Sequence, residues 1–398
     1  MEIRKLTKED MINVIKLHQY SYGFWTDQDV RDEDHNFMIP ENSIGLFEND
    51  TLVSVATIMR TQQSIRGILK GMGGLSMICT NPENRMKGYV RSIMQSAFLE
   101  MKETELSVSM LEPFRESFYT HLGYAPACDK FRLKAPMSGL RVPSDSMIGD
   151  EWTVERLPGH EAKELYMTFI KAFALTKFHG YAYNPSIRDE EWRRRNKDHH
   201  YVFIKKAGKV EALARYTLKG YMHFEQGELT IREMYWRSLQ AQAVLFNFLG
   251  KHRDQIQTIH MILPYGTDFQ HWFEHLQDWI EIKVWHPWMV RVIDAKEALK
   301  GLPVSTDGEL ILTLTDSQCG WNNGTYLLKS TNDQLDVSMT KRSAQLETSI
   351  QGLSALVYGT HSIEALEYNG WIKGISDSTR KLIHGWFPQL PLYNPYTF

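Results

Sequence analysis

Short apolar runs and longer amphipathic stretches alternate along the whole chain. Runs such as 44–48 and 201–205, bounded by turn residues, predict strands. Stretches such as 85–102 and 236–251 are long enough for helices and carry apolar residues three and four positions apart. This alternation predicts mixed α/β architecture throughout.

The first 150 residues form one such unit, with the expected order β-α-β-β-β-α-β-α-β. Its first helix has a start signal, because Thr7 is followed three residues later by Asp10, a variant of the capping box. A strand over 74–80, a helix from Arg85 and a single strand over 124–133 are predicted further along. Residues 136–150 are rich in Pro and Gly and indicate a linker.

A second unit repeats this order, and a third differs from both. We predict domains at 1–150, 151–289 and 290–398. The third region has two strands, three short helices and an aromatic tail stiffened by Pro388, Pro391 and Pro395.

Charge and cysteine content narrow the class of protein. The chain has 45 Lys and Arg against 48 Asp and Glu, which argues against a nucleic-acid or membrane-surface binder. Its three cysteines do not make a disulfide framework, so a reducing compartment fits best. With no signal-peptide core and no apolar run of membrane-span length, we expect a cytoplasmic protein.

The strongest chemical signal lies between Gly73 and Arg91, where a strand runs through a turn into a helix that opens with Arg-x-x-Gly. The first turn of a helix has unpaired N–H groups and a positive dipole end, which together favour an anion. Gly88 lets a phosphate approach the backbone, and Arg85, Lys87 and Arg91 add positive charge. The pattern predicts a pyrophosphate site, and the strand edge before it suits an amide-bearing arm such as pantetheine.

A second signal follows at Phe118-Tyr119-x-x-x-Gly123-Tyr124. A phenol placed beside a thioester can hydrogen-bond the leaving sulfur and supply its proton. The alternative is that Tyr119 is a core aromatic residue packed on the sheet.

Together these two motifs resemble those of GNAT acetyltransferases. Val90 stands where that family usually has Gly or Ala, and Met86 where it often has Arg. Over its full length the chain resembles the Eis (enhanced intracellular survival) type of N-acetyltransferase. The resemblance implies two GNAT-like domains in tandem, the second degenerate, and a C-terminal domain like sterol carrier proteins.

The resemblance also implies roles for individual residues. Acetyl-CoA would be the cosubstrate, Tyr119 the general acid and the terminal carboxylate of Phe398 the general base. Transfer would be direct, to an amine of a polyamine, an aminoglycoside or a lysine side chain, by a homo-oligomer such as a hexamer. The implied cofactor-binding residues are Ile78, Cys79, Thr80, Arg85, Met86, Lys87, Gly88, Tyr89, Val90, Arg91, Phe114 and Arg115.

Acidic and aromatic residues between the first helix and the next strand are candidates for the acceptor site. Five acids fall between Asp27 and Asp34 and can attract a polycation, although a solvated loop has the same composition. Phe24, Trp25 and Asp27 are the predicted substrate-binding residues.

Two alternatives to an enzyme remain open on the sequence alone. A non-catalytic lipid or acyl-CoA carrier would bind acyl chains without turnover, and a sensor would bind acetyl-CoA without releasing thiol. His271-x-x-x-His275 has the spacing of a metal pair but no evident third ligand, so we expect no metal.

Overall fold

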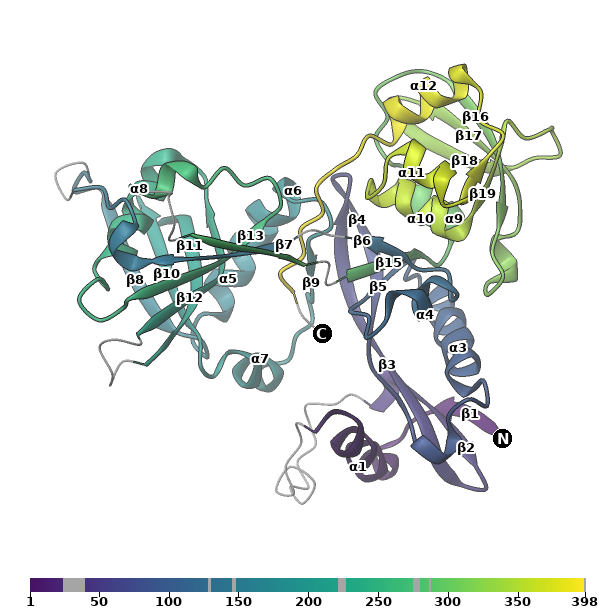
Figure 1. Ribbon diagram of the computed structural model, residues 1–398, viewed down its shortest axis with the longest axis horizontal. Helices are drawn as coiled ribbons and strands as arrows, with labels where there is room; N and C mark the ends of the chain where they lie inside the picture. Colours follow the sequence, from purple (N-terminus) through teal and green to yellow (C-terminus); the bar gives the residue numbers. More distant parts are fainter. Residues whose placement is uncertain are drawn as a thin grey trace.

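Three β-sheets organise the chain (Figure 1). The structure is a computed structural model, and it describes residues 1–23, 40–127, 130–144, 148–220, 227–274, 280–285 and 288–396. Mixed α/β architecture, as predicted, is confirmed in all three parts. No helix among these residues combines the length and the apolar character needed to cross a bilayer.

The first sheet has eight strands in the order β1-β2-β3-β4-β5-β15-β6, with β9 attached to β3. The predicted capping box forms at its start, where the Thr7 N–H donates to the Asp10 carboxylate at 2.8 Å. Helix α3 packs on β2, β3 and β4, while α1 contacts β3 and β4. The strands and helices of this part are β1 (Glu2–Lys5), α1 (Met11–Tyr22), β2 (Ser43–Glu48), β3 (Thr51–Ile65), β4 (Ile68–Thr80), α3 (Tyr89–Glu103), β5 (Val108–Leu111), α4 (Glu116–Thr120), β6 (Ala125–Ala127), β9 (Ala182–Tyr183) and β15 (Trp288–Val292).

The second sheet has seven strands in the order β14-β7-β13-β12-β11-β10-β8. Its core is a separate apolar cluster that includes Val202, Leu229 and Leu245. Its elements are β7 (Lys130–Pro136), β8 (Trp152–Pro158), α5 (Lys163–Phe169), α6 (Leu175–Lys177), α7 (Asp189–Asn196), β10 (His200–Lys206), β11 (Lys209–Lys219), β12 (Glu228–Trp236), α8 (Leu239–Gly250), β13 (Thr258–Pro264) and β14 (Glu281–Trp285).

The two sheets exchange strands. Strand β15 lies between β5 and β6 of the first sheet, where it appears green among blue strands in Figure 1. Strand β7 joins the second sheet, between β13 and β14. The predicted single strand over 124–133 is therefore wrong, because the chain leaves one sheet at Ala127 and enters the other at Lys130. Strand β7 precedes the predicted boundary at 150 and yet joins the second sheet, while β15 spans the predicted boundary at 289 and joins the first sheet.

The third sheet has five strands in the order β18-β17-β16-β19-β20. One continuous apolar core joins it to the first sheet, since Met110, Val290, Leu353 and Leu392 belong to the same cluster. Its elements are α9 (Ala295–Leu299), β16 (Glu309–Thr315), β17 (Gly324–Thr331), β18 (Gln334–Met339), β19 (Leu346–Ser349), α10 (Ile350–Tyr358), α11 (Ile363–Tyr368), β20 (Ile372–Lys373) and α12 (Asp377–Trp386).

The tail after α12 leaves the third part and runs between the two larger sheets (Figure 1). The Tyr393 N–H donates to the His179 carbonyl at 2.9 Å, and the buried Asn394 side chain accepts from the Ala182 N–H at 3.3 Å. Burial of the predicted apolar tail is thus confirmed from Leu392 to Pro395, whereas Pro388 and Pro391 are exposed. The predicted catalytic Phe398 lies outside the described residues.

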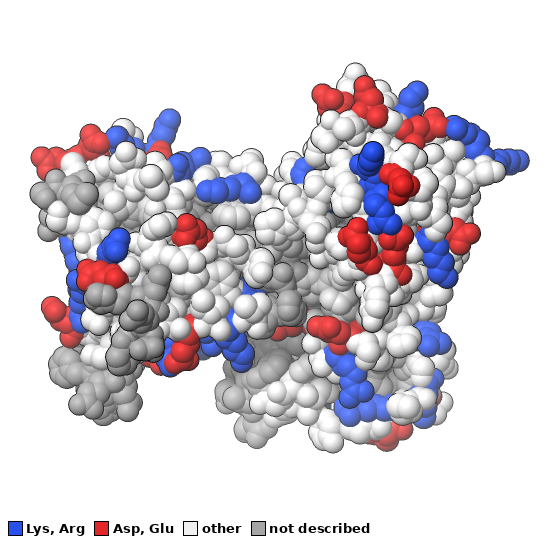
Figure 2. All heavy atoms as spheres, turned by 45° about the horizontal axis from the view of Figure 1, so that its top comes forward, with Lys and Arg blue, Asp and Glu red and all other residues white. Residues whose placement is uncertain are grey.

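Charges of both signs are interspersed on the face drawn in Figure 2. Neither sign dominates that face, which agrees with the formal net charge of −3.

A buried histidine at the junction of the three parts makes stability depend on pH. The His179 Nδ1 accepts from the Arg66 N–H at 2.9 Å, so the ring is neutral and its Nε2–H donates to the Tyr358 carbonyl at 2.9 Å. Burial lowers its pKa from 6.5 to about 4. The native state therefore binds fewer protons than the unfolded state, and stability present above pH 6.5 is lost as the pH falls towards 4.

We expect His179 to contribute a slope of at most about 1.4 kcal/mol per pH unit in that window. Urea unfolding at a series of pH values measures it. His179→Gln keeps a donor and an acceptor without the titration, so its profile should be shallower. An unchanged slope in this variant would contradict the assignment.

Candidate active site

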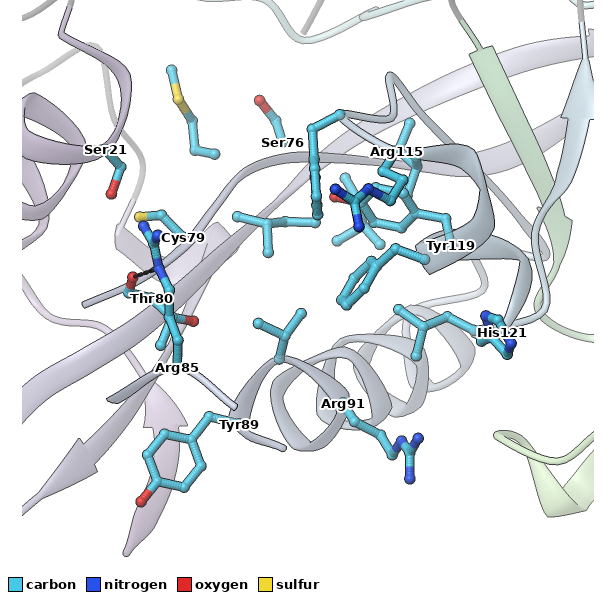
Figure 3. A pocket seen from close by; sticks show the side chains of 18 of the residues that line it. Ser21, Ser76, Cys79, Thr80, Arg85, Tyr89, Arg91, Arg115, Tyr119 and His121 are labelled. Atoms are coloured by element: carbon cyan, nitrogen blue, oxygen red, sulfur yellow. Dashed lines mark hydrogen bonds between the residues drawn. The ribbon is translucent and has the colours of Figure 1, made fainter. Parts of the chain in front are cut away.

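A fork opens in the first sheet between β4 and β5. The two strands pair in parallel only from Met72 to Leu75, opposite Val108 to Leu111. Strand β4 then continues to Thr80, and no described strand pairs with it on that side. A cavity of about 1290 Å³ lies at this opening, lined by β4, α1 and α3 and by the segment after β5 (Figure 3). Its size suits a ligand larger than a typical drug molecule.

A bulge shapes β4 at the fork. The register against β3 shifts between the pairs Thr57–Ser76 and Val55–Cys79, and Met77 has a φ of 53°. Two side chains of α1 bind the bulge: the Tyr22 hydroxyl donates to the Ile78 carbonyl at 2.6 Å, and the His18 Nε2 lies 3.2 Å from the Met77 carbonyl. Helix α1 thus anchors the strand that borders the cavity.

Helix α3, whose first turn is the predicted anion site, starts later than expected. The helix begins at Tyr89 and not at Arg85, because the residues before it form a short 3₁₀ turn, Pro82–Asn84. Gly88 is the N-cap with a φ of 82°, and this left-handed conformation explains the glycine, because a Cβ there would meet no atom within 4 Å and crowding is not the reason. The Ser92 N–H donates to the Gly88 carbonyl at 3.2 Å, so the amides of Tyr89 to Arg91 are those of the first turn, and these three residues line the cavity.

Basic side chains at this end separate into two groups. Arg85 and Arg91 line the cavity, and Arg85 also donates to the Thr80 carbonyl at 3.3 Å (Figure 3). Lys87 is not among the lining residues; its ammonium lies 3.6 Å from the Glu48 carboxylate. Glu48 also accepts from Asn84 at 2.8 Å and from the Tyr89 hydroxyl, which fixes the turn.

Tyr119 projects from α4 at the other side of the same cavity. Its side chain is buried against Phe114, Phe118 and Tyr124. Burial raises its pKa to about 12, so the phenol stays protonated at neutral pH. Its hydroxyl makes no hydrogen bond to any described residue, which leaves it free to donate to a ligand.

The cavity collects most of the residues that the sequence singled out. All the predicted cofactor-binding residues except Lys87 line it, together with Tyr119. The predicted substrate-binding Phe24, Trp25 and Asp27 lie outside the described residues. Lining residues that the sequence reasoning missed include Ser21, Asn84, Glu112, Phe118 and His121. Tyr22 also lines the cavity; it follows His18 by one helical turn on the same face and, with Phe24 and Trp25, is a candidate for an aromatic wall of the acceptor site.

At the corresponding strand end of the second sheet, the described residues do not repeat the features of the predicted anion site. Helix α8 follows β12 without the Arg-x-x-Gly turn, and the Ser238 hydroxyl accepts from the Ala241 N–H at 3.1 Å. In α8 a side-chain cap therefore occupies one amide of the first turn, whereas α3 has no side-chain cap hydrogen bond. Nearby, Trp236 packs against Trp272 and Phe246.

The C-terminal tail approaches the fork from the opposite face. The Asn394 amide donates to the Met110 sulfur at 3.3 Å, and Trp288 Nε1–H donates to the Asn394 carbonyl at 3.3 Å. Met110 directly precedes Leu111, which lines the cavity. The described part of the tail thus ends in the neighbourhood of the site.

Known protein families match all three parts of the chain. Residues 2–127 and 185–292 each match a family described as Acetyltransferase (GNAT) domain, and residues 295–392 match the Sterol carrier protein domain. No curated protein matches the chain at the sequence level.

Solved structures share the whole fold at low identity. A GCN5-related N-acetyltransferase from Anabaena variabilis has a TM-score of 0.86 at 17% identity, covering 100% of both chains. One from Kribbella flavida has 0.83 at 20%, covering 100% of this chain and 98% of its own. Eis1 from Mycobacterium abscessus has 0.80 at 12%, covering 100% of both. At these identities the likeness concerns the architecture.

Proposed function

We propose that this chain, a GNAT-type acetyltransferase with two such domains and a sterol-carrier-like C-terminal domain, transfers acetyl directly from acetyl-CoA to a primary amine. One observation carries the proposal. A single cavity contains a helix N-terminus flanked by two arginines and, across it, a buried tyrosine with a free hydroxyl.

Coenzyme A would enter with its pyrophosphate at the start of α3. The amides beyond Gly88, Arg85 and Arg91 supply positive potential there. Its pantetheine arm would lie along the unpaired edge of β4 from Ser76 to Thr80, where backbone amides can pair with it. The thioester then reaches the end of the fork nearest Tyr119.

Acetyl transfer requires that protons are removed from the acceptor nitrogen and that one proton is supplied to the leaving sulfur. The amine, once deprotonated, attacks the thioester carbonyl, and the collapsing intermediate breaks the carbon–sulfur bond. Tyr119 donates to the departing thiolate, and its pKa of about 12 keeps it in the donor form at working pH. After attack the nitrogen loses a second proton, which replaces the one that Tyr119 has donated. The products are an acetamide, free coenzyme A thiol and the one proton released when the ammonium form of the acceptor was deprotonated.

For the proton acceptor we assign the α-carboxylate of Phe398. The buried run from Leu392 to Pro395 and the Asn394–Met110 contact direct the tail towards the fork and support this assignment. A carboxylate would also attract a cationic acceptor. Polyamines and aminoglycosides carry several amines, so they are the acceptor classes we propose first.

Thiol release on mixing the protein with acetyl-CoA and a panel of amines tests the proposal. Turnover with at least one polyamine, aminoglycoside or lysine peptide is expected. Binding of acetyl-CoA without thiol release for any amine would favour a sensor. Binding of acyl chains without acetyl-CoA binding would favour a lipid carrier.

Replacing the cavity arginines should weaken acetyl-CoA binding selectively. Arg85→Ala and Arg91→Ala each remove a positive charge from the cavity lining at the start of α3, where we place the pyrophosphate, so we expect KM for acetyl-CoA to rise roughly tenfold with a smaller change in kcat. Lys87→Ala is the matched control, because Lys87 lies next to them in sequence but pairs with Glu48. Equal effects of all three substitutions would indicate only a general charge effect.

Adding one residue after Phe398 tests the assigned base. The extension displaces the carboxylate by one residue, and we expect kcat to fall roughly tenfold to a hundredfold with KM for acetyl-CoA unchanged. Steady-state thiol release measures both constants. Unchanged turnover would remove Phe398 from the mechanism while leaving the cofactor site in place.

A further inference from the structure

The helix that carries Tyr119 ends against side chains from the C-terminal part of the chain. Helix α4 has only five residues and ends at Thr120, where the following turn supplies a first partner: the Gly123 N–H donates to the Thr120 carbonyl at 3.0 Å. Side chains from the C-terminal part add further donors. Gln351 Nε2–H donates to the Thr120 carbonyl at 2.8 Å, and Arg291 Nη1–H donates to the Leu122 carbonyl at 2.8 Å. A weaker contact of 3.4 Å joins Gln318 to the carbonyl of His121 between them.

These donors come from elements far away in sequence. Arg291 lies on the exchanged strand β15, Gln318 follows β16, and Gln351 lies in the first turn of α10. The end of α4 is therefore capped from outside by the strand and the domain that follow residue 287.

Arg291 is itself held rigidly. Its side chain is fully buried, and Nη2 donates to both Asp316 oxygens, at 2.9 and 2.8 Å. Asp316 also accepts from the Cys319 N–H at 3.1 Å and from Asn322 at 3.0 Å. One Arg291 nitrogen meets both carboxylate oxygens in this buried ion pair, and the further donors to Asp316 leave the pair little freedom to move.

The glycine of the tyrosine motif makes room for this arginine. Gly123 has a φ of 91°, and a Cβ placed on it would lie 1.4 Å from Arg291 Nη1. Only glycine allows both the backbone conformation and the close approach of the guanidinium. The glycine four residues after Tyr119 therefore belongs to the contact with Arg291.

We infer that the C-terminal domain and β15 position the catalytic tyrosine, with Gln351 and Arg291 as positioning residues that set the tilt of α4. Tyr119 directly precedes the first capped carbonyl, and its own carbonyl accepts from the N–H groups of Leu122 and Tyr124 at 2.9 and 3.0 Å. A shift of the turn from Thr120 to Leu122 therefore moves the phenol relative to the thioester. This inference rests on the proposed role of Tyr119 as acid.

Gln351→Ala is the test, because it removes one partly buried neutral donor and leaves the Arg291–Asp316 pair intact. We expect kcat to fall roughly threefold to tenfold, the scale of one hydrogen bond, with KM for acetyl-CoA unchanged. Lys70→Ala is the matched control. The Lys70 ammonium crosses the same boundary, donating to the carbonyls of Glu297 and Lys300 at 2.7 Å each, and lies on β4 away from α4. The kcat of the Lys70→Ala variant should equal that of the wild type.

A double-mutant cycle that combines Gln351→Ala with Tyr119→Phe distinguishes an effect on the position of the phenol from a general destabilisation of the fold. If Gln351 acts through the phenol, Gln351→Ala has no further effect on kcat once the hydroxyl is gone. An equal loss of kcat in both backgrounds, or no loss in either, overturns the inference while the acid role stands. If Tyr119→Phe itself leaves kcat unchanged, the proposed acid role fails instead.

Discussion

Replacing Tyr119 with Phe is expected to lower kcat by about 10²–10⁴-fold while leaving KM for acetyl-CoA nearly unchanged. The substitution removes the hydroxyl and keeps the ring that packs against Phe114, Phe118 and Tyr124, so the fold should persist. The lost step is proton donation to the leaving sulfur. Steady-state thiol release with saturating amine measures the effect.

Tyr124→Phe is the matched control for this experiment. Tyr124 is also buried and its ring lies 6.1 Å from that of Tyr119, but its hydroxyl is bonded to Ser109 at 2.7 Å. Loss of the Tyr124 hydroxyl should reduce stability with less than about a threefold change in kcat. Similar losses of kcat in both variants would indicate that packing, and not proton donation, is the function of Tyr119.

In the wild-type protein, the pH profile of kcat should show no fall caused by ionisation of Tyr119 below about pH 12.

Replacing Glu233 with Leu is expected to reduce the free energy of unfolding by about 3–5 kcal/mol. Glu233 is 1% exposed, and one of its oxygens lies 2.6 Å from Arg215. The other accepts from the hydroxyls of three tyrosines at 2.9 to 3.0 Å: Tyr166, Tyr181 and Tyr235. Leucine would leave the arginine charge and three buried donors without their acceptor.

Chemical denaturation measures this loss, and Glu281→Ala is its control. Glu281 forms a pair with Lys134 at 2.7 Å, but its side chain is 72% exposed, so its removal should change stability by less than about 0.5 kcal/mol. A loss for Glu233→Leu no larger than that of the control would show that the buried network does not stabilise the second sheet.

Much of the candidate site could be predicted from the sequence because it depends on residues close together in the chain. The capping box at Thr7 and the turn before α3 are short-range features, so residue types at fixed spacing suffice to find them. The Arg-x-x-Gly turn and Tyr119 lie on opposite sides of one cavity because the fork between β4 and β5 separates the segments that follow these strands. Their proximity depends only on the order of neighbouring strands.

What the sequence left open depends on contacts between distant segments. The run over 124–133 is apolar enough for one strand, and no local signal shows that its two halves enter different sheets. The bulge at Met77 depends on His18 and Tyr22 of α1, and the cap on α4 depends on residues more than 150 positions away. Periodicity reports which face of an element is buried, but not which partner covers it.

The exchange of β7 and β15 has a consequence for the order of folding during synthesis. A nascent chain that has emerged as far as β6 lacks the strand that separates β6 from β5, and that strand is translated roughly 160 residues later. At ribosomal speeds this delay is on the order of ten seconds or more. Throughout it the exposed edge of β5 can pair with other chains, so chaperone dependence should be concentrated in this interval of translation.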